Sequence, residues 1–428
     1  MNKKLAIAAA AALAVGLAGC GTGGQSDVST SGGATVGAAT SVELKVWSIE
    51  LSDNEKAAMD ELVSEFTTAN PGVTITIEQR ATDPHKEALR LALGTPSFPD
   101  IYWYWEGPGL GGELVGQGAS LDLTPYYQQY GWDARFGDSV LANITQYGGY
   151  HGVPWTIQGE ALFYNKTLFD TAGITKVPTT YAELVDAADK LKAAGITPFA
   201  TGGTVNWYVM RLLDSLIETT CGAGLADQIN TLKASWAGQT CVNDSFTELK
   251  KWADNYFNDG YMSIDDTQSN ELFYTGEAAM ALQGSWFDSD VKDNGMDLGA
   301  VGVFTFPTGT GRLYGFGEGY YVSATTDKAD LAAKWLDFIT STDKQKQTAG
   351  MFGALSVNQA VQPDATNPLN QLWPAIFSNA TGMYLNNDQN LTLANTTEYW
   401  RIQNAVLTGE IAPNDAGAQF QKFIDANG

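Results

Sequence analysis

Strand-like and helix-like segments alternate in the first part of the chain, and this alternation constrains the fold more than any other feature. Residues 42–48 alternate apolar and polar side chains, and residues 53–66 carry apolar side chains at helical spacing. Further strand-like segments follow at 73–78 and, after another helical pattern, at 100–105. Strands separated by helices predict an α/β fold with a mostly parallel sheet covered by helices on both faces.

The segment GVPWTIQGEALFYNK, residues 152–166, interrupts this alternation. Pro154 has no N–H group, which excludes the middle of a helix or of a central strand. Residues 161–164 then alternate like a short strand. We interpret the segment as a crossing from one α/β lobe to another, with the polar side chains of Gln158 and Glu160 at the point where the lobes close on a ligand.

Two later segments are also interpreted as crossings. Residues 307–319 are rich in proline and glycine, and residues 352–357 are irregular. A helix is expected over residues 367–380. The predicted organisation is a signal peptide over 1–19, a lipidated cysteine and flexible tether over 20–41, an N-terminal lobe of 42–156 plus 308–354, and a C-terminal lobe of 157–307 plus 355–428.

The N-terminal segment has the pattern of a secreted lipoprotein. Lys3 and Lys4 precede an apolar run, residues 5–17, that is too short to span a membrane as a mature helix. The run ends in Leu-Ala-Gly-Cys, which matches the lipobox of bacterial lipoproteins and predicts lipidation of Cys20. The alternative is an ordinary secretion signal that a cysteine happens to follow. Residues 21–41 are rich in Gly, Ser, Thr and Ala and predict a flexible tether.

Composition excludes several classes of partner and chemistry. The formal net charge is −24, which argues against nucleic acid or an anionic lipid surface as a partner. His85 and His151 lack the spacing of metal ligands, and we expect no metal or cofactor. With Cys20 lipidated, Cys221 and Cys241 remain as a pair in an oxidising compartment, so we expect a disulfide between them. Two free buried thiols are the alternative.

Aromatic and carboxylate residues gather where the first and third strands are predicted to end. Ligands of open α/β sheets bind beyond the carboxyl ends of the strands, which here are residues 47–50 and 102–106. Flat rings cover the apolar face of a sugar ring, and carboxylates accept hydrogen bonds from its hydroxyl groups. Residues 107–112 fit GxGxxG, but Pro108 and the lack of a long following helix argue against a dinucleotide site.

Seven pieces of the chain, taken in their order and spacing, resemble the extracellular solute-binding proteins of bacterial ABC importers. The resemblance is to the large sugar-binding family that includes maltose-binding protein. It implies the periplasmic-binding-protein type II fold, with two α/β lobes, several crossings and a ligand cleft between the lobes. The pieces are ELKVWS, TTANPGVTITIE, FPDIYW, GVPWTIQGEALFYNK, GEAAMALQGSW, GEGYYVSATTDKADLAAKWLDFITS and FGALSVN.

The resemblance also implies ligand-binding residues. Each has a structural alternative: Trp103 and Trp105 alternate with tyrosines, so one face of their strand is core, and the glutamates could be solvated or cap helices. Trp252 and Trp335 are assigned to the core, and Trp155 to packing at the hinge. The implied ligand-binding residues are Glu50, Tyr104, Trp105, Glu106, Gln158, Asn206, Trp207, Trp286, Glu318 and Tyr320, with Glu398 and Trp400 aligning more loosely.

Taken together, these features predict a lipid-anchored, monomeric receptor on the extracellular face of the bacterial cytoplasmic membrane. It would capture a neutral oligosaccharide and deliver it to separate ABC permease subunits. A secreted glycoside hydrolase is the main alternative, because carboxylate pairs and aromatic subsites also serve sugar hydrolysis. A structural lipoprotein or adhesin is the third class considered.

Overall fold

The computed structural model of the protein describes residues 41–427. The predicted signal peptide, Cys20 and all of the predicted tether except Ser41 lie outside the described residues. Among residues 41–427, no helix is long and apolar enough to cross a membrane.

The first lobe contains the elements predicted at the start of the chain. Its first helix buries Met59, Leu62 and Phe66 along one face, as their spacing predicts, and Ser52 caps its N-terminus. The elements of this lobe are β1 (Val42–Ile49), α1 (Asp53–Ala69), β2 (Val73–Arg80), α2 (Thr82–Ala92), β3 (Ile101–Trp105), α3 (Gly111–Gly116), α4 (Thr124–Tyr130), the 3₁₀ turn Trp132–Ala134, α5 (Asp138–Thr145), α12 (Ala329–Ile339) and α13 (Thr342–Gln347).

The second lobe is richer in helices. The helix expected over residues 367–380 is shorter than predicted and begins at Trp373, with Pro374 in its first turn. The elements of this lobe are α6 (Lys166–Thr171), α7 (Tyr181–Ala193), β5 (Thr197–Phe199), α8 (Asn206–Asn230), α9 (Thr240–Asn255), the 3₁₀ turn Tyr261–Ser263, α10 (Asp266–Tyr274), β6 (Ala278–Gly284), α11 (Phe287–Asp293), the 3₁₀ turn Leu298–Ala300, β7 (Val301–Phe304), α14 (Trp373–Asn379), β9 (Met383–Tyr384), α15 (Asn387–Asn390), α16 (Leu393–Thr408) and α17 (Pro413–Asn427).

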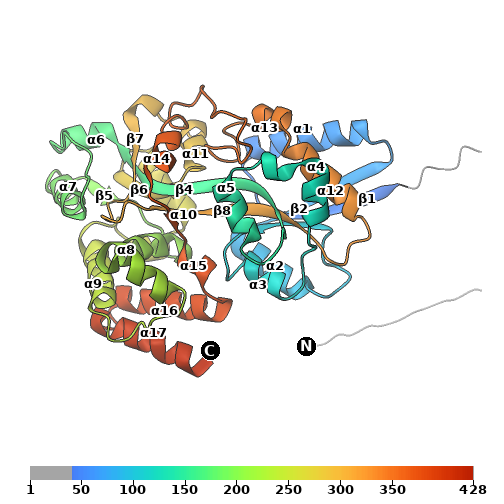
Figure 1. Cartoon of the computed structure of the whole chain (residues 1–428). Helices are drawn as coiled ribbons and strands as arrows, with labels where there is room; N and C mark the ends of the chain where they lie inside the picture. The colour runs from blue at the N-terminus through green and yellow to red at the C-terminus, as the bar shows by residue number, and fades with distance from the viewer. Residues whose placement is uncertain (1–40, 428) are drawn as a thin grey trace, which may run out of the picture. The chain divides into compact units, whose positions relative to one another are not determined.

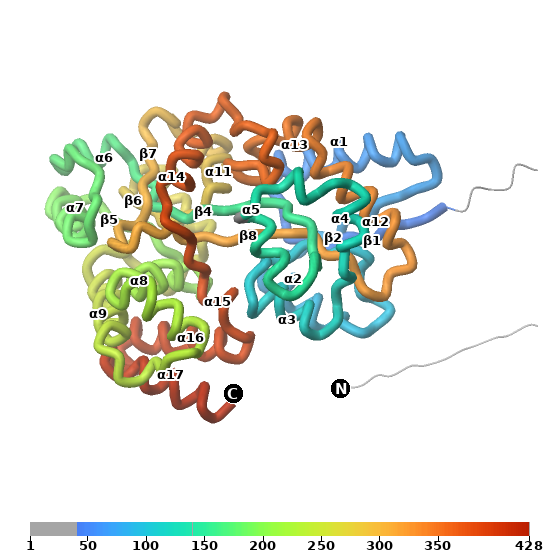
Figure 2. Tube along the Cα trace, in the orientation of Figure 1, coloured from blue at the N-terminus to red at the C-terminus, as the bar shows by residue number. Residues whose placement is uncertain are grey.

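Two long strands, β4 (Val153–Asn165) and β8 (Leu313–Val322), belong to both lobes (Figure 1). They pair antiparallel, and the strand order is β2-β1-β3-β8-β4-β6-β5, with β7 on β4 and β9 on β8. Pro154 is the second residue of β4, at a shift in register between Pro154 and Thr156. Its missing N–H therefore falls near the strand start rather than in its middle. Figure 2 shows the two chain traces running alongside each other between the lobes.

The expectation of a mostly parallel sheet is wrong, because the sheet is mixed. β1 pairs in parallel with β2 and β3, and β5 with β6, whereas β3–β8, β4–β6 and β4–β8 are antiparallel. A strand that leaves the first lobe and one that returns to it must run in opposite directions. The crossings therefore introduce the antiparallel pairs, and β8 also occupies part of the segment 307–319 that is expected to be irregular.

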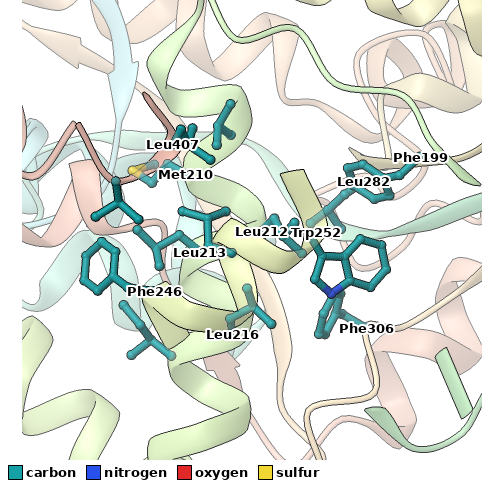
Figure 3. Close-up of a cluster of buried hydrophobic side chains, with 14 of the residues drawn as sticks. Phe199, Met210, Leu212, Leu213, Leu216, Phe246, Trp252, Leu282, Phe306 and Leu407 are labelled. Atoms are coloured by element: carbon teal, nitrogen blue, oxygen red, sulfur yellow. The ribbon is translucent and has the colours of Figure 1, made fainter. Parts of the chain in front are cut away.

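Each lobe has its own apolar core. The first core packs side chains of β1, β3, α1 and α12, and Trp335 is buried within it as predicted. In the second lobe, one core lies around α8 and α9, and a smaller one packs α11 and α14 against β4 and β6. Figure 3 shows part of the α8–α9 core, where Leu212, Leu213 and Leu216 lie near Phe246 and Trp252.

A disulfide joins Cys221 to Cys241, as the sequence predicts. It connects α8 to the start of α9 across 20 residues of chain. Gly222, the next residue after Cys221, has a φ of 69° and interrupts α8 with a kink. The disulfide therefore ties α8 to α9 beside this kink.

Candidate functional site

A cavity of about 480 Å³ lies between the two lobes. We call it the cleft cavity. It is lined from the first lobe by the segment after β1 and by β3, and from the second by α8, α10 and the turn after β6. The crossing strands β4 and β8 contribute Gln158, Phe316, Glu318 and Tyr320. Because its walls come from both lobes, the size of the cavity depends on how far the lobes are closed.

Two tryptophans of β3 form the aromatic wall on the first-lobe side. Successive side chains of a strand point to opposite faces, so Trp103 and Trp105 share one face. Both line the cavity, with ring centroids 4.6 Å apart in an edge-to-face arrangement. Tyr102 and Tyr104 lie on the other face and are buried in the first core.

Two tryptophans of the second lobe, Trp207 and Trp286, lie around one arginine. The guanidinium carbon of Arg211 is 4.8 Å from the ring centroid of Trp207 and 5.1 Å from that of Trp286. Arg211 Nε is 2.6 Å from Glu160 Oε1, and its Nη1 donates to Gln283 at 2.8 Å. These fixed contacts hold the guanidinium, which in turn holds both rings by cation–π attraction.

The polar centre of the cavity lies on the crossing strands. The Glu318 carboxylate accepts hydrogen bonds from the Thr156 hydroxyl and from Gln158 Nε2, the latter at 3.4 Å. Gln158 also accepts from Ser285 at 2.5 Å and donates to the carbonyl of Phe352 at 3.1 Å. Burial raises the pKa of Glu318 to about 7, although the hydrogen bonds from Thr156 and Gln158 lower it. This carboxyl can therefore accept, or when protonated donate, a hydrogen bond inside the cavity.

A group of carboxylates from both lobes lines the cavity. Burial raises the pKa of Asp290 to about 7, and the negative charges of Glu55, Asp293 and Asp266 add to the increase. Across the lobes, Asn54 Nδ2 donates to Asp293 Oδ2 at 2.7 Å. Glu55, Asp266 and Asp290 all line the cavity. Their oxygens are suited to hydroxyl donors of a solute.

The two basic side chains that line the cavity are both paired with carboxylates. Lys86 lies 3.1 Å from Asp388, and Arg211 contacts Glu160. Neither cation is left to bind a phosphate or a carboxylate of a solute, and the surrounding charge is negative. The electrostatics therefore disfavour an anionic solute. Among residues 41–427, no group of three or more His, Cys, Asp or Glu side chains is arranged to hold a metal ion.

The structure brings together seven of the ten residues predicted to bind ligand. They come from the crossing strands β4 and β8 or from the ends of β1, β3, β6 and α8 that face the gap between the lobes. They are Glu50, Trp105, Gln158, Trp207, Trp286, Glu318 and Tyr320.

Tyr104, Glu106 and Asn206 do not line the cleft cavity, and each has a structural reason. Strand alternation turns Tyr104 away from the side of Trp105. Glu106 is buried against Gly317 and Gly319, on the face of β8 opposite Glu318. Asn206 begins α8, and its Oδ1 accepts a hydrogen bond from Asn404 Nδ2 at 2.7 Å, which ties α8 to α16.

Sequence reasoning missed several cavity residues. Trp155, assigned to hinge packing, lines the cavity. Lys86 and Arg211 lie within helices, where a basic residue is ordinarily solvated, and their position gives no signal of burial. Asn386 precedes a four-residue helix, and Asp388 is its second residue; no periodicity reveals this helix. Only the resemblance to a family of two-lobed proteins could indicate that this C-terminal segment returns to the cleft.

The fold and the cleft define a class, the binding proteins that enclose a solute between two α/β lobes. A family model described as "Bacterial extracellular solute-binding protein" matches residues 52–346, and the chain belongs to this family. The family and the type II fold implied by the sequence resemblance are therefore confirmed.

Individual proteins are similar along most of the chain. A maltodextrin-binding protein of Bacillus subtilis (strain 168) is 25% identical over 388 residues, covering 88% of this chain and 86% of that protein. A multiple sugar-binding protein of Streptococcus mutans is 27% identical over 387 residues, covering 82% and 86%. The solved structure of a chitin oligosaccharide binding protein has a TM-score of 0.82 and 25% identity, and covers 90% of this chain and 98% of that one.

Proposed function

We propose that the protein is a lipid-anchored extracellular receptor that captures a neutral oligosaccharide between its closing lobes and delivers it to an ABC importer. The proposed binding residues are the seven predicted residues that line the cleft cavity, together with Trp103 and Trp155. The anchor is the lipid on Cys20, and the receptor acts as a monomer. We propose the lobe division that the sequence predicts, 42–156 plus 308–354 and 157–307 plus 355–428, with the start of β8 also pairing with β9 of the second lobe.

One observation carries this proposal: aromatic side chains and carboxylates that have no basic partner line the same cavity. Trp103 and Trp105 face the cavity from one lobe, and Trp207 and Trp286 from the other. A sugar ring between such walls presents its C–H faces to the indoles and its hydroxyl groups to the carboxylates. Several rings in one cavity favour a solute of two or more sugar units over a monosaccharide.

The similar proteins support a carbohydrate solute. The two sequence relatives are named for maltodextrin and for multiple sugars, and the structural neighbour for a chitin oligosaccharide. All three are named as binding proteins. Their differing names leave the sugar unit and the linkage to be found by experiment.

The test is a thermal-shift and calorimetric screen of the purified protein against maltodextrins, xylo-oligosaccharides and chito-oligosaccharides. A ligand that binds the native state alone raises the unfolding free energy by about 2.7 kcal/mol at a hundredfold excess over Kd, which shifts the midpoint by several degrees. Trp286→Ala should weaken binding at least tenfold, whereas Trp286→Phe, which keeps a flat ring, should retain most of it. A protein that binds no carbohydrate in the screen would refute the proposal.

The same samples address the enzyme alternative. A receptor releases its oligosaccharide intact, so chromatography of the mixture after prolonged incubation should recover the added glycan unchanged. Sustained hydrolysis by the purified protein, abolished in Glu318→Gln, would instead favour a glycoside hydrolase.

A further inference from the structure

A second cavity lies beside the cleft cavity and is also lined by both lobes. Its volume is about 390 Å³, against about 480 Å³ for the cleft cavity. From the first lobe it is lined by α2 and by Leu110, and from the second by Leu393 and Trp400 of α16. Like the cleft cavity, it exists only while the lobes are together. We call it the side cavity.

The two cavities have two lining residues in common, Lys86 and Asp388. Lys86 Nζ, from α2, lies 3.1 Å from Asp388 Oδ2, from α15, and each side chain is only 9% exposed. The ammonium also lies 4.7 Å from the ring centroid of Trp105, in the aromatic wall of the cleft cavity. One ion pair between the lobes therefore separates two parts of the same interlobe space.

The side cavity has side chains of the same kinds as the cleft cavity. Trp400 is half-buried there, and its indole N–H donates to Met210 Sδ at 3.2 Å, which fixes the ring. Leu110 adds an apolar surface, Asp83 and Glu87 provide carboxylates, and Arg90 provides a guanidinium group. A held indole beside carboxylates suits a sugar ring for the reasons that apply to the cleft.

We propose that the side cavity is a further subsite for one end of the oligosaccharide, and that the Lys86–Asp388 pair is the partition that a long solute must cross. The proposal rests on the proposed function. Short oligosaccharides fill the cleft cavity alone and leave the ion pair in place. Longer ones pass between Lys86 and Asp388 and place their terminal sugar against Trp400.

The ion pair is suited to such an exchange. Burying two charges costs solvation energy that their mutual attraction only partly offsets. The ammonium has three donors and the carboxylate several acceptor positions, so hydroxyl groups of a passing sugar can replace each partner. Lys86 keeps its position on the face of Trp105 when Asp388 is exchanged for a hydroxyl group. The solute can thus cross without leaving either charge unpaired.

The experiment measures affinity against chain length. Maltodextrins, xylo-oligosaccharides and chito-oligosaccharides of two to about seven units are titrated into the intact protein by calorimetry, and the series that binds is kept. The same titrations are made with Trp400→Ala, with Trp400→Phe and with Asp388→Asn. Thermal midpoints and far-ultraviolet circular dichroism show that each variant is folded.

We expect the affinity of the intact protein to rise in two steps as the oligosaccharide lengthens. The second step comes when the oligosaccharide becomes too long for the cleft cavity. Trp400→Ala should remove the second step, a loss of about tenfold for long chains with little change for short ones, and Trp400→Phe should restore it. Asp388→Asn, which removes the charge of the partition, should raise the ratio of long-chain to short-chain affinity.

Three results would overturn the subsite. The first is a single step in affinity, and the second is an equal loss at every length in Trp400→Ala. The third is full binding of long chains by that variant. Failure of every glycan series to bind the intact protein would instead refute the proposed function, and the subsite with it.

Discussion

Closure of the lobes depends on glycines that have no room for a side chain. The backbone N–H of Gly109, in the loop after β3, donates to the carbonyl of Gln389 at 2.6 Å, which joins the first lobe to α15 of the second. A Cβ atom added at Gly109 would overlap the carbonyl of Leu391, and one added at Gly107 would overlap Gln389. Neither glycine has a positive φ. Gly109→Ala therefore obstructs contact between the lobes without straining its own backbone.

The expected loss of affinity follows from the contact that is broken. The interlobe hydrogen bond contributes about 1 kcal/mol, and an overlap of this kind costs about 1–3 kcal/mol when surrounding atoms must shift. Destabilising the closed form by about 2–4 kcal/mol corresponds to a roughly 30- to 900-fold weaker affinity for the solute. The unliganded protein can relieve the overlap by separating its lobes, so its unfolding midpoint should change little.

The assay is calorimetric titration with the oligosaccharide found in the screen, combined with small-angle scattering with and without it. Gly109→Ala should bind weakly and stay more extended than the unsubstituted protein at equal ligand concentration. Gly116→Ala is the matched control, because a Cβ at the end of α3 meets no atom within 4 Å. Unchanged affinity in Gly109→Ala would refute the inference that this contact belongs to the ligand-bound form.

Three further predictions concern stability. Burial raises the folded-state pKa values of Glu318 and Asp290 from 4.5 and 3.8 to about 7, so each carboxyl binds a proton more tightly in the folded than in the unfolded state. The stability that the two carboxyls contribute should be complete below about pH 4, fall as the pH rises to about 7 and then level off. The fall should be smaller in Glu318→Gln, and thermal midpoints across this range would show it. Arg211→Met leaves the buried Glu160 carboxylate without its partner and should lower the free energy of unfolding by about 3–5 kcal/mol, measured with denaturant. The double variant Arg211→Met/Glu160→Gln should recover most of this loss, and full stability of the single variant would contradict the account. Replacing both Cys221 and Cys241 by serine should lower the unfolding free energy by about 3 kcal/mol, because the disulfide closes a loop of 20 residues in the unfolded chain. Solute affinity should stay the same, and a change above threefold would show that the disulfide also shapes the cleft.

The sequence predicts the elements of the first lobe because their signals are local. Strand alternation and helical spacing locate β1, α1, β2 and β3 to within a few residues. The direction of pairing is not local. Residues 313–322 form β8 because neighbours from β3 and β4 lie on both sides, although the proline and glycine before them indicate an irregular segment. Tertiary pairing thus overrides local composition at the crossings.

The cleft could be predicted in part for a similar reason. Trp105 ends β3 and Trp286 follows β6, and the carboxyl ends of both strands lie beside the crossing strands between the lobes, so their positions indicate the cavity. Glu106 also follows β3, yet it lies behind β8, because strand alternation puts it on the face opposite Trp105 and the small Gly317 and Gly319 leave room there. The sequence of β3 does not indicate which of its two faces borders the cavity. Residues at a strand end are therefore predictable as a group, whereas the choice of face is not.

The distribution of charge in the cleft connects its packing to its selectivity. Both cations that line the cavity are already paired and each also lies against indole rings, so their role is to hold aromatic walls in place. The carboxylates of Glu318 and Asp290, in contrast, have no basic partner, and burial raises the pKa of both. The cleft thus holds its aromatic surfaces rigidly and leaves these carboxylates without a cation. A solute rich in hydroxyl groups can donate further hydrogen bonds to them, whereas a solute with its own anionic group would add to the negative charge already confined there.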